Sequence, residues 1–196
     1  MLKRVNKDGK FYFKTREQYI DYTVYFDYIE IHTVINTEVL NEVVEECWYW
    51  YPYVSYIKIK EEIIKNKNKK SVFKVRIDDI VVEQLTIDEN KLQQVSCWIK
   101  EEKDIVVGLV QIDDNYVCID GYSRLMQAYL LEFKYVYAYL EESSDFIRIC
   151  RQWCIDEDIH HISDLESRIV NSEEHQRIWV NRCQKFLKNQ KNVLLA

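Results

Sequence analysis

The chain is poor in the residues that usually interrupt helices and strands, because it has one proline, Pro52, and three glycines among 196 residues. This scarcity predicts closely connected secondary structure. The sequence also lacks any run approaching the roughly 18 apolar residues of a membrane-spanning helix. Its N-terminal stretch, MLKRVNKDGKFYFKTREQ, is positively charged but has no apolar signal-peptide core. We therefore expect a cytoplasmic protein with no membrane partner.

Positive charge is also in short supply, since 27 Lys and Arg stand against 33 Asp and Glu, a formal net charge of −6. Non-specific binding to nucleic acid depends on neutralising phosphates with Lys and Arg. DNA is therefore not the expected partner, and binding through a local basic patch is kept as the alternative. The 47% hydrophobic content is enough for a substantial core.

Six cysteines occur in a chain without a recognisable secretion signal, which predicts free thiols rather than a disulfide framework. Cys150 and Cys154 lie four residues apart, with His160 and His161 downstream, a set that could suit zinc. The two cysteines also belong to an ordinary apolar helical stripe, and no C-x-x-C pair is present. We predict no zinc site at these residues.

The sequence divides into three parts: an aromatic-rich α/β extension over residues 1–70, an ordered α/β domain over 71–142, and a helical segment over 143–196. In the first part we expect one or two strands within residues 11–35, with a partly helical stretch as the alternative, then a helix capped by Asn36 or Thr37 and a strand over 53–60. The lysine- and asparagine-rich stretch KEEIIKNKNKKS, residues 60–71, reads as a linker. Ser163 and Ser172 are plausible helix caps in the last part.

Residues 71–142 alternate between strands and helices. We predict a strand in SVFKVRIDDIVVEQ, a helix in TIDENKLQQVSCWIKEE starting near Thr86 or Asp88, and strands in IVVGLVQI and YVCI around a turn at residues 113–115. A second helix follows Gly121, and KYVYAYLE forms the closing strand. The fold class is therefore α+β, with a mixed sheet in this domain.

The stretch YVCIDGYSRL places Gly121 between Asp120 and Arg124, where a strand gives way to a helix. A glycine at such a junction permits a sharp turn or a close approach of another group. A helix N-terminus presents N–H groups and a partial positive charge, which favour a phosphate. The alternative is a simple glycine turn in which Arg124 pairs with a surface carboxylate.

Residues 74–142 resemble the N-terminal domain shared by ParB partition proteins, sulfiredoxins and free-serine kinases. The resemblance covers the element order, the IDGYSRL motif and the closing strand. It implies a ParB/sulfiredoxin-like fold in which Gly121, Tyr122, Ser123 and Arg124 bind the phosphates of a nucleotide such as ATP, ADP or CTP. It also implies that Asp120 holds the turn or helps to organise Mg²⁺.

Departures from the family pattern narrow the expected activity. Tyr122 and Ser123 stand where the serine kinases carry two histidines and where ParB carries a glutamate and an arginine. Sulfiredoxins place their nucleophilic cysteine at the position of Tyr122, so sulfinic-acid repair is not expected. Glu83 lies about where the serine kinases have a glutamate that acts as general base, although a lone loop glutamate is more often a solvated surface residue.

Two functions of different classes follow from these observations. The first is binding of a nucleotide or related phosphate ligand, with phosphotransfer to a small hydroxylated molecule through Glu83 and Asp120 as catalytic residues. The second is a non-catalytic ParB-like module that regulates or binds DNA or a protein partner. The oligomeric state is left open by the sequence.

Overall fold

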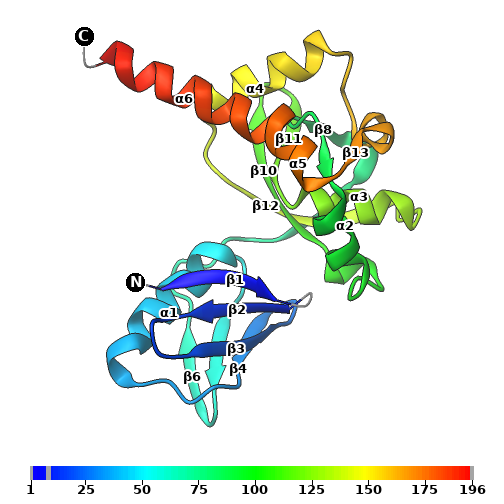
Figure 1. The fold of residues 1–196 in the computed structure, drawn as a ribbon. Helices are drawn as coiled ribbons and strands as arrows, with labels where there is room; N and C mark the ends of the chain where they lie inside the picture. Colours follow the sequence, from blue (N-terminus) through cyan, green and yellow to red (C-terminus); the bar gives the residue numbers. More distant parts are fainter. Residues whose placement is uncertain (1, 8–9, 195–196) are drawn as a thin grey trace. The chain divides into compact units, whose positions relative to one another are not determined.

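The computed structural model describes residues 2–7 and 10–194, and the chain divides into two compact units (Figure 1). Residues 1–72 form the N-terminal unit and residues 73–196 the C-terminal unit. The expected boundary at residues 70 and 71 lies within two residues of this division. Residues 143–196 were expected as a part of their own, but they belong to the C-terminal unit. Both units combine helices with sheets, so the fold is α+β.

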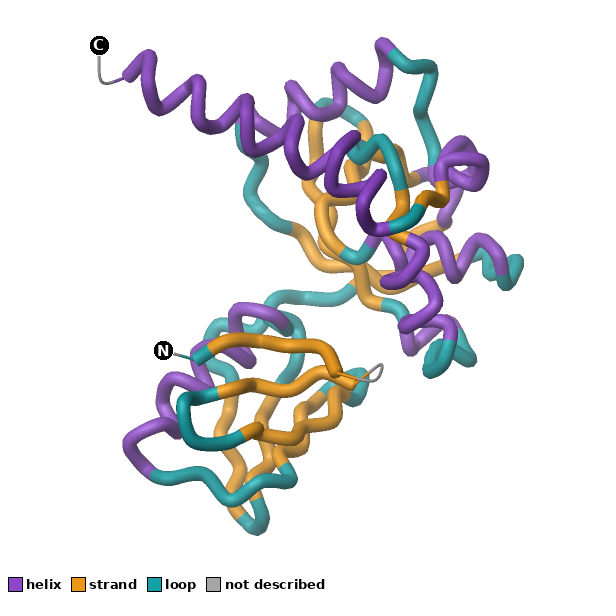
Figure 2. The backbone as a smooth tube through the Cα atoms, in the orientation of Figure 1, coloured by secondary structure: helices purple, strands orange, loops and turns teal. Residues whose placement is uncertain are grey.

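The N-terminal unit is a six-stranded sheet whose strands follow one another in chain order (Figure 2). Strands β4 and β5 are parallel because α1 connects them, and the other neighbouring strands are antiparallel. Val43 and Cys47 on α1 are fully buried, as are Phe13 and Ile29 on the sheet. The elements are β1 (Lys3–Lys7), β2 (Lys10–Lys14), β3 (Tyr19–Val24), β4 (Tyr28–Ile31), α1 (Thr37–Trp50), β5 (Tyr56–Ile59) and β6 (Glu62–Lys65).

Two expectations for the N-terminal unit need correction. Residues 11–35 contain strands from β2, β3 and β4 rather than one or two strands, a further strand, β1, precedes them, and the expected linker 60–71 contains β6. Lys60 adopts a left-handed conformation, φ 54°, which turns the chain back so that Ile64 pairs with Ile57 across the antiparallel strands. The expected cap of α1 is confirmed, because the Asn36 side chain accepts the Glu38 N–H.

The C-terminal unit contains a mixed five-stranded sheet in the order β7-β12-β10-β11-β8. Residues 71–84 were expected as one strand, but a 3-10 turn at Ile77–Asp79 divides them into strands on opposite edges of this sheet. Ile77 is buried in this turn, so the chain changes direction without leaving the core. The strands are β7 (Phe73–Arg76), β8 (Ile80–Val82), β10 (Val106–Ile112), β11 (Asn115–Asp120) and β12 (Tyr135–Leu140), and a separate short pair joins β9 (Ile87–Asp88) to β13 (Ile169–Val170).

The hairpin and the helix expected around Gly121 are confirmed. Strands β10 and β11 are antiparallel and joined at residues 113–114, where Asp113 has φ 54°, and α3 begins at Tyr122. Helix α2 is shorter than expected and starts after Asp88, whose side chain accepts the N–H groups of Asn90 and Lys91. The helices are α2 (Glu89–Ser96) and α3 (Tyr122–Leu130).

The last third of the chain packs onto the same core as the sheet. Cys150, Leu165 and Trp179 are buried in one cluster with the strands. The expected caps at Ser163 and Ser172 are wrong, because His161 and Asn171 occupy the cap positions. The Asn171 side chain accepts the Glu174 N–H, and the Asp164 carboxylate accepts the His161 N–H. The segments are α4 (Asp145–Asp156), a 3-10 helix (Ile162–Arg168), α5 (Ser172–His175), a π-helical turn (Gln176–Val180) and α6 (Asn181–Leu194). In the described part of the chain, every helix is too short or too polar to cross a bilayer.

Candidate functional site

The junction between β11 and α3 is built on the left-handed backbone of Gly121, which has φ 92° and ψ 23°. An L-residue rarely adopts this conformation, so glycine removes the strain that a side chain would introduce. The first hydrogen bond of the helix runs from the Leu125 N–H to the Gly121 carbonyl, at 2.8 Å. The N–H groups of Tyr122 and Ser123 precede this bond and lie at the positive end of the helix.

The guanidinium of Arg124 folds back over Gly121. Its Nη2 lies 2.8 Å from the Asp120 Oδ2. A Cβ atom on Gly121 would approach the Arg124 Nη2 to 2.8 Å and its Nε to 3.0 Å. Asp120, Gly121 and Arg124 therefore form one cluster at the start of α3, with the side chain of Asp120 52% exposed and that of Arg124 21% exposed. The glycine serves both the turn and the close approach of the guanidinium.

This geometry contains the pairing that the simple-turn alternative requires, an arginine bound to a carboxylate. The Nη2 atom of Arg124 donates to the Asp120 carboxylate, and a guanidinium of this kind is also a group that can meet a phosphate in a bidentate manner.

A second glycine, Gly108, also lies beside Asp120. Its proximity to the site was not predicted from the sequence. A Cβ atom on Gly108 would lie 3.0 Å from the Tyr139 hydroxyl and 3.3 Å from the Asp120 Cβ. The register between β10 and β11 shifts at this point. An isolated glycine within an otherwise apolar strand often marks such a bulge, and this signal was present in IVVGLVQI.

Tyr122 does not present its side chain to a ligand at the start of α3. Its hydroxyl donates to the Cys118 carbonyl and accepts the Glu83 N–H at 2.8 Å. Burial raises the pKa of this phenol well above its ordinary value. The expected contribution of Tyr122 to phosphate binding is therefore restricted to its main-chain N–H, while Ser123 is half-buried in the first turn.

Glu83 is buried rather than solvated, so the surface-residue alternative is wrong. The residue is 8% exposed, and its carboxyl group is hydrogen-bonded to the Cys150 thiol on α4. Desolvation raises the pKa of this carboxyl group well above its usual range, which favours the protonated form. The main chain of Glu83 reaches the α3 junction through Tyr122, whereas its carboxyl group is directed to α4.

The expectations about thiols and metals can be compared directly with the structure. All six cysteines are free thiols, as predicted. Within the described residues, no three His, Cys, Asp or Glu side chains gather in a way that could hold a metal ion. Mg²⁺ at nucleotide sites commonly takes one or two carboxylates together with the phosphates. Asp120, exposed at the start of α3, fits that role.

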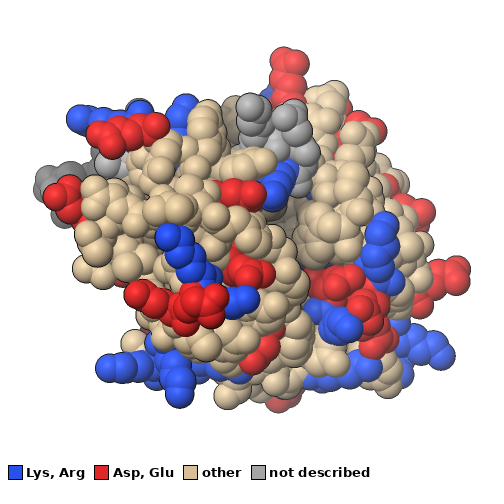
Figure 3. All heavy atoms as spheres, turned by 90° about the horizontal axis from the view of Figure 1, so that it is seen from below, with Lys and Arg blue, Asp and Glu red and all other residues tan. Residues whose placement is uncertain are grey.

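Positive and negative side chains are mixed on the face displayed in Figure 3. Independently of that view, several cations of the C-terminal unit lie against carboxylates, as in Lys74 with Glu102 at 2.6 Å and Arg168 with Glu157 at 2.8 Å. An anion would therefore be attracted by local donors, such as those at α3, rather than by a broad positive surface.

Comparison with known proteins does not assign a family. No protein-family model and no curated protein matches the chain. Among solved structures, protein Atu1540 from Agrobacterium tumefaciens is similar with a TM-score of 0.36 and 15% identity. The match covers 49% of this chain and 61% of that one. Similarity at this level supports no argument about fold or function, so the candidate site depends on its own geometry.

Proposed function

We propose that the C-terminal unit binds the phosphates of a nucleotide at the start of α3. The observation that carries this proposal is the position of the Arg124 guanidinium, which lies over Gly121 at the N-terminal end of the helix. Main-chain N–H groups, the helix dipole and a guanidinium then act on the same small region. The Ser123 hydroxyl supplies an additional donor in the same turn.

The ligand class that suits these groups is a nucleotide such as ATP, ADP or CTP. A guanidinium binds phosphate oxygens in a bidentate manner, and N–H groups at a helix start bind them without a requirement for a particular base. Asp120 would serve as the protein ligand of Mg²⁺ bound to the phosphates. The resemblance of residues 74–142 to ParB proteins, sulfiredoxins and free-serine kinases supports the same ligand class and a ParB/sulfiredoxin-like fold.

Phosphotransfer to a small hydroxylated molecule is the second part of the proposal. It assigns Glu83 as the general base and Asp120 as the residue that organises the phosphates. The Glu83 carboxyl group interacts with the Cys150 thiol on α4, so catalysis requires the acceptor hydroxyl to reach this buried group and the carboxyl group to be ionised. Without such access, the unit functions as a binding or regulatory module, which is the rival proposal.

Thermal unfolding in the presence of ligands tests the binding proposal. ATP, ADP, CTP, GTP and pyrophosphate should be compared with and without Mg²⁺, because a ligand at 100 times its Kd stabilises the folded state by about 2.7 kcal/mol. Arg124→Ala should weaken binding by about 1.5 to 3 kcal/mol, the range for a hydrogen bond to a charged group. The fold should persist, since the Arg124 side chain lies outside the main core.

Arg177→Ala is the matched control, because it removes the same charge from the same unit at a side chain that is 70% exposed. Its nucleotide affinity should equal that of the wild type. Equal affinity in wild type and Arg124→Ala, with both proteins folded, would show that the IDGYSRL motif is only a turn. A flat response of the wild type to all five ligands would favour the binding module that acts on a macromolecular partner.

A further inference from the structure

Helices α4 and α6 pack against each other through a regular stripe of side chains. Phe146 stacks on Phe186 of α6 with ring centroids 5.8 Å apart, and Trp153 meets Trp179, in the π-helical turn that leads into α6, edge to face at 6.3 Å. These contacts pair the early part of α4 with a later part of the C-terminal helix, so the two helices run antiparallel. Residues 146, 150, 153 and 157 follow the spacing of one helical face.

Cys150 and Cys183 oppose each other within this stripe. Cys150 lies in the core cluster against which Cys183 packs, and the two residues fall between the Phe146–Phe186 and Trp153–Trp179 contacts. Each thiol affects the pKa of the other, and Cys150 also interacts with the Glu83 carboxyl group. Cys150 is fully buried, whereas Cys183 is half-buried near the start of α6. The Phe146 and Phe186 rings lie on one side of the thiol pair. On the other side, the Arg182 guanidinium lies 4.6 Å from the centre of the Trp153 ring.

We propose that Cys150 and Cys183 form a reversible disulfide when the protein meets a peroxide. In the first step, the Cys183 thiolate attacks one oxygen of the peroxide and becomes a sulfenic acid, while the other oxygen leaves as water or an alcohol after protonation. In the second step, the Cys150 sulfur attacks the Cys183 sulfur. The S–S bond forms, the S–O bond breaks, and the hydroxyl leaves with the Cys150 proton as water.

The roles of the two cysteines follow from their surroundings. Cys183 is the partly accessible thiol, and the hydrogen bond from Cys150 lowers its pKa, with Arg182 acting in the same direction. Cys150 is out of reach of solvent but already next to Cys183, as a resolving thiol must be.

The disulfide would change the molecule in two ways. It would join α4 to α6 covalently, and it would remove the thiol hydrogen that Cys150 shares with Glu83. Both changes occur away from the Arg124 cluster, so the proposal is independent of nucleotide binding at α3. Reversible thiol oxidation of this kind suits a reducing compartment, where lasting structural disulfides are rare.

The test uses the full chain treated with hydrogen peroxide in its folded state. We expect the number of titratable thiols after denaturation to fall by two, and a peptide map to show Cys150 joined to Cys183. A reducing agent should restore both thiols. Oxidation of urea-unfolded protein should instead give mixed pairings, because the helices no longer hold the two cysteines together.

Cys183→Ser should abolish this cross-link and lower the rate of reaction with peroxide at least tenfold. Cys97→Ser is the matched control, since Cys97 is the exposed cysteine on the same unit, and it should leave the cross-link unchanged. A cross-link that persists with another cysteine in Cys183→Ser at the wild-type yield would overturn the proposal. Conversion of Cys183 in the wild type to sulfinic acid without any Cys150 cross-link would overturn it as well.

Discussion

Each unit contains a partly buried arginine, and the two arginines have opposite surroundings. In the N-terminal unit, Arg4 donates to the hydroxyls of Tyr51 at 2.7 Å and Tyr22 at 3.2 Å, and it lies 3.8 Å from the centre of the Phe11 ring. In the C-terminal unit, Arg124 lies on a helix start beside an exposed carboxylate. An arginine enclosed by aromatic rings stabilises a fold, whereas one at a helix start is placed to meet an anion.

The two units also differ in net charge. Residues 1–72 carry 12 Lys and Arg against 11 Asp and Glu, which leaves 15 against 22 for residues 73–196. The proposed phosphate site is therefore in the more acidic unit. A search by net charge would choose the other unit, because the proposed phosphate site depends on a few oriented donors rather than on an excess of positive charge.

The largest expected effect concerns Arg4. Arg4→Ala removes two hydrogen bonds to a charged group, each worth about 1.5 to 3 kcal/mol, so the N-terminal unit should lose about 3 kcal/mol or more of stability. Hydrogen exchange measured peptide by peptide should show faster exchange in residues 10–72 and unchanged protection in the sheet of the C-terminal unit.

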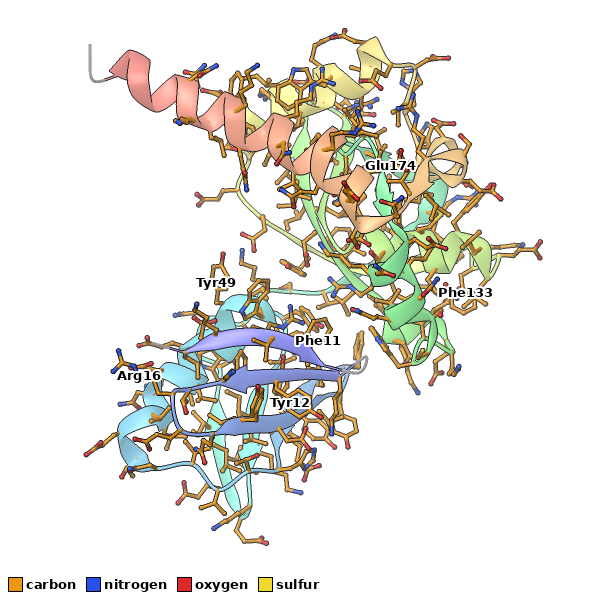
Figure 4. All side chains as sticks on the ribbon, in the orientation of Figure 1. Phe11, Tyr12, Arg16, Tyr49, Phe133 and Glu174 are labelled. Atoms are coloured by element: carbon orange, nitrogen blue, oxygen red, sulfur yellow. The ribbon has the colours of Figure 1, made fainter. Side chains whose placement is uncertain are left out.

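Arg16→Ala is the control for this prediction, because Arg16 is exposed between β2 and β3 (Figure 4). It should leave exchange in both units as in the wild type. If Arg4→Ala retained full protection in the N-terminal unit, Arg4 would have no structural role and the contrast with Arg124 would disappear.

The second prediction concerns the C-terminal unit and is the effect of Glu83 on the pH dependence of its stability. Folding raises the pKa of this carboxyl group above its ordinary value of 4.5, so the unfolded chain releases the proton first as the pH rises. From that point up to the raised pKa, the wild type should lose about 1.4 kcal/mol of stability per pH unit through this group. Below pH 4.5 this loss should be absent.

Glu83→Gln keeps the shape of the side chain and cannot ionise, so it should remove this dependence. Urea unfolding between about pH 5 and pH 8 should therefore give a difference between wild type and variant that grows with pH. Glu132→Gln, at an exposed position, should follow the wild type. A constant difference across the range would mean that the Glu83 carboxyl group is not held in its neutral form.

The junction around Gly121 was predictable from the sequence because its determinants are local. A polar turn between two apolar runs specifies the hairpin, and a glycine before a helical pattern specifies the start of α3. The direction of the Tyr122 side chain was not predictable, since it depends on the Cys118 carbonyl and the Glu83 N–H meeting at one point. That meeting requires β8 to lie beside β11, a pairing between distant parts of the chain.

The environment of Glu83 also could not be predicted from the sequence. Its partner Cys150 comes from a helix that appeared to belong to a separate segment, and its burial depends on α4 and α6 closing over the edge of the domain. The stripe of Ile147, Cys150 and Trp153 correctly indicated a core-facing helix. Periodicity shows which face of a helix is buried but does not identify what that face meets.

The smallest expected effect concerns the tyrosines of the N-terminal unit. Tyr28 stacks between Tyr25 and Tyr56, with ring centroids 4.4 Å and 5.1 Å away and interplanar angles of 12° and 4°. Their ring faces are occupied by one another, which indicates a stabilising ladder across the strands rather than a platform for a ligand. Tyr28→Leu should cost about 1 kcal/mol, the range of cross-strand aromatic pairs.

Urea unfolding of the N-terminal unit, followed by hydrogen exchange, measures this cost. Tyr49→Leu is the control because Tyr49 is 75% exposed on α1 and makes one edge contact with Trp50, so its effect should stay within about 0.5 kcal/mol. Nucleotide affinity should be unchanged in both variants, since the ladder belongs to the other unit. A loss of nucleotide binding in Tyr28→Leu at full stability would place the ligand on the tyrosine face and reverse the assignment of roles to the two units.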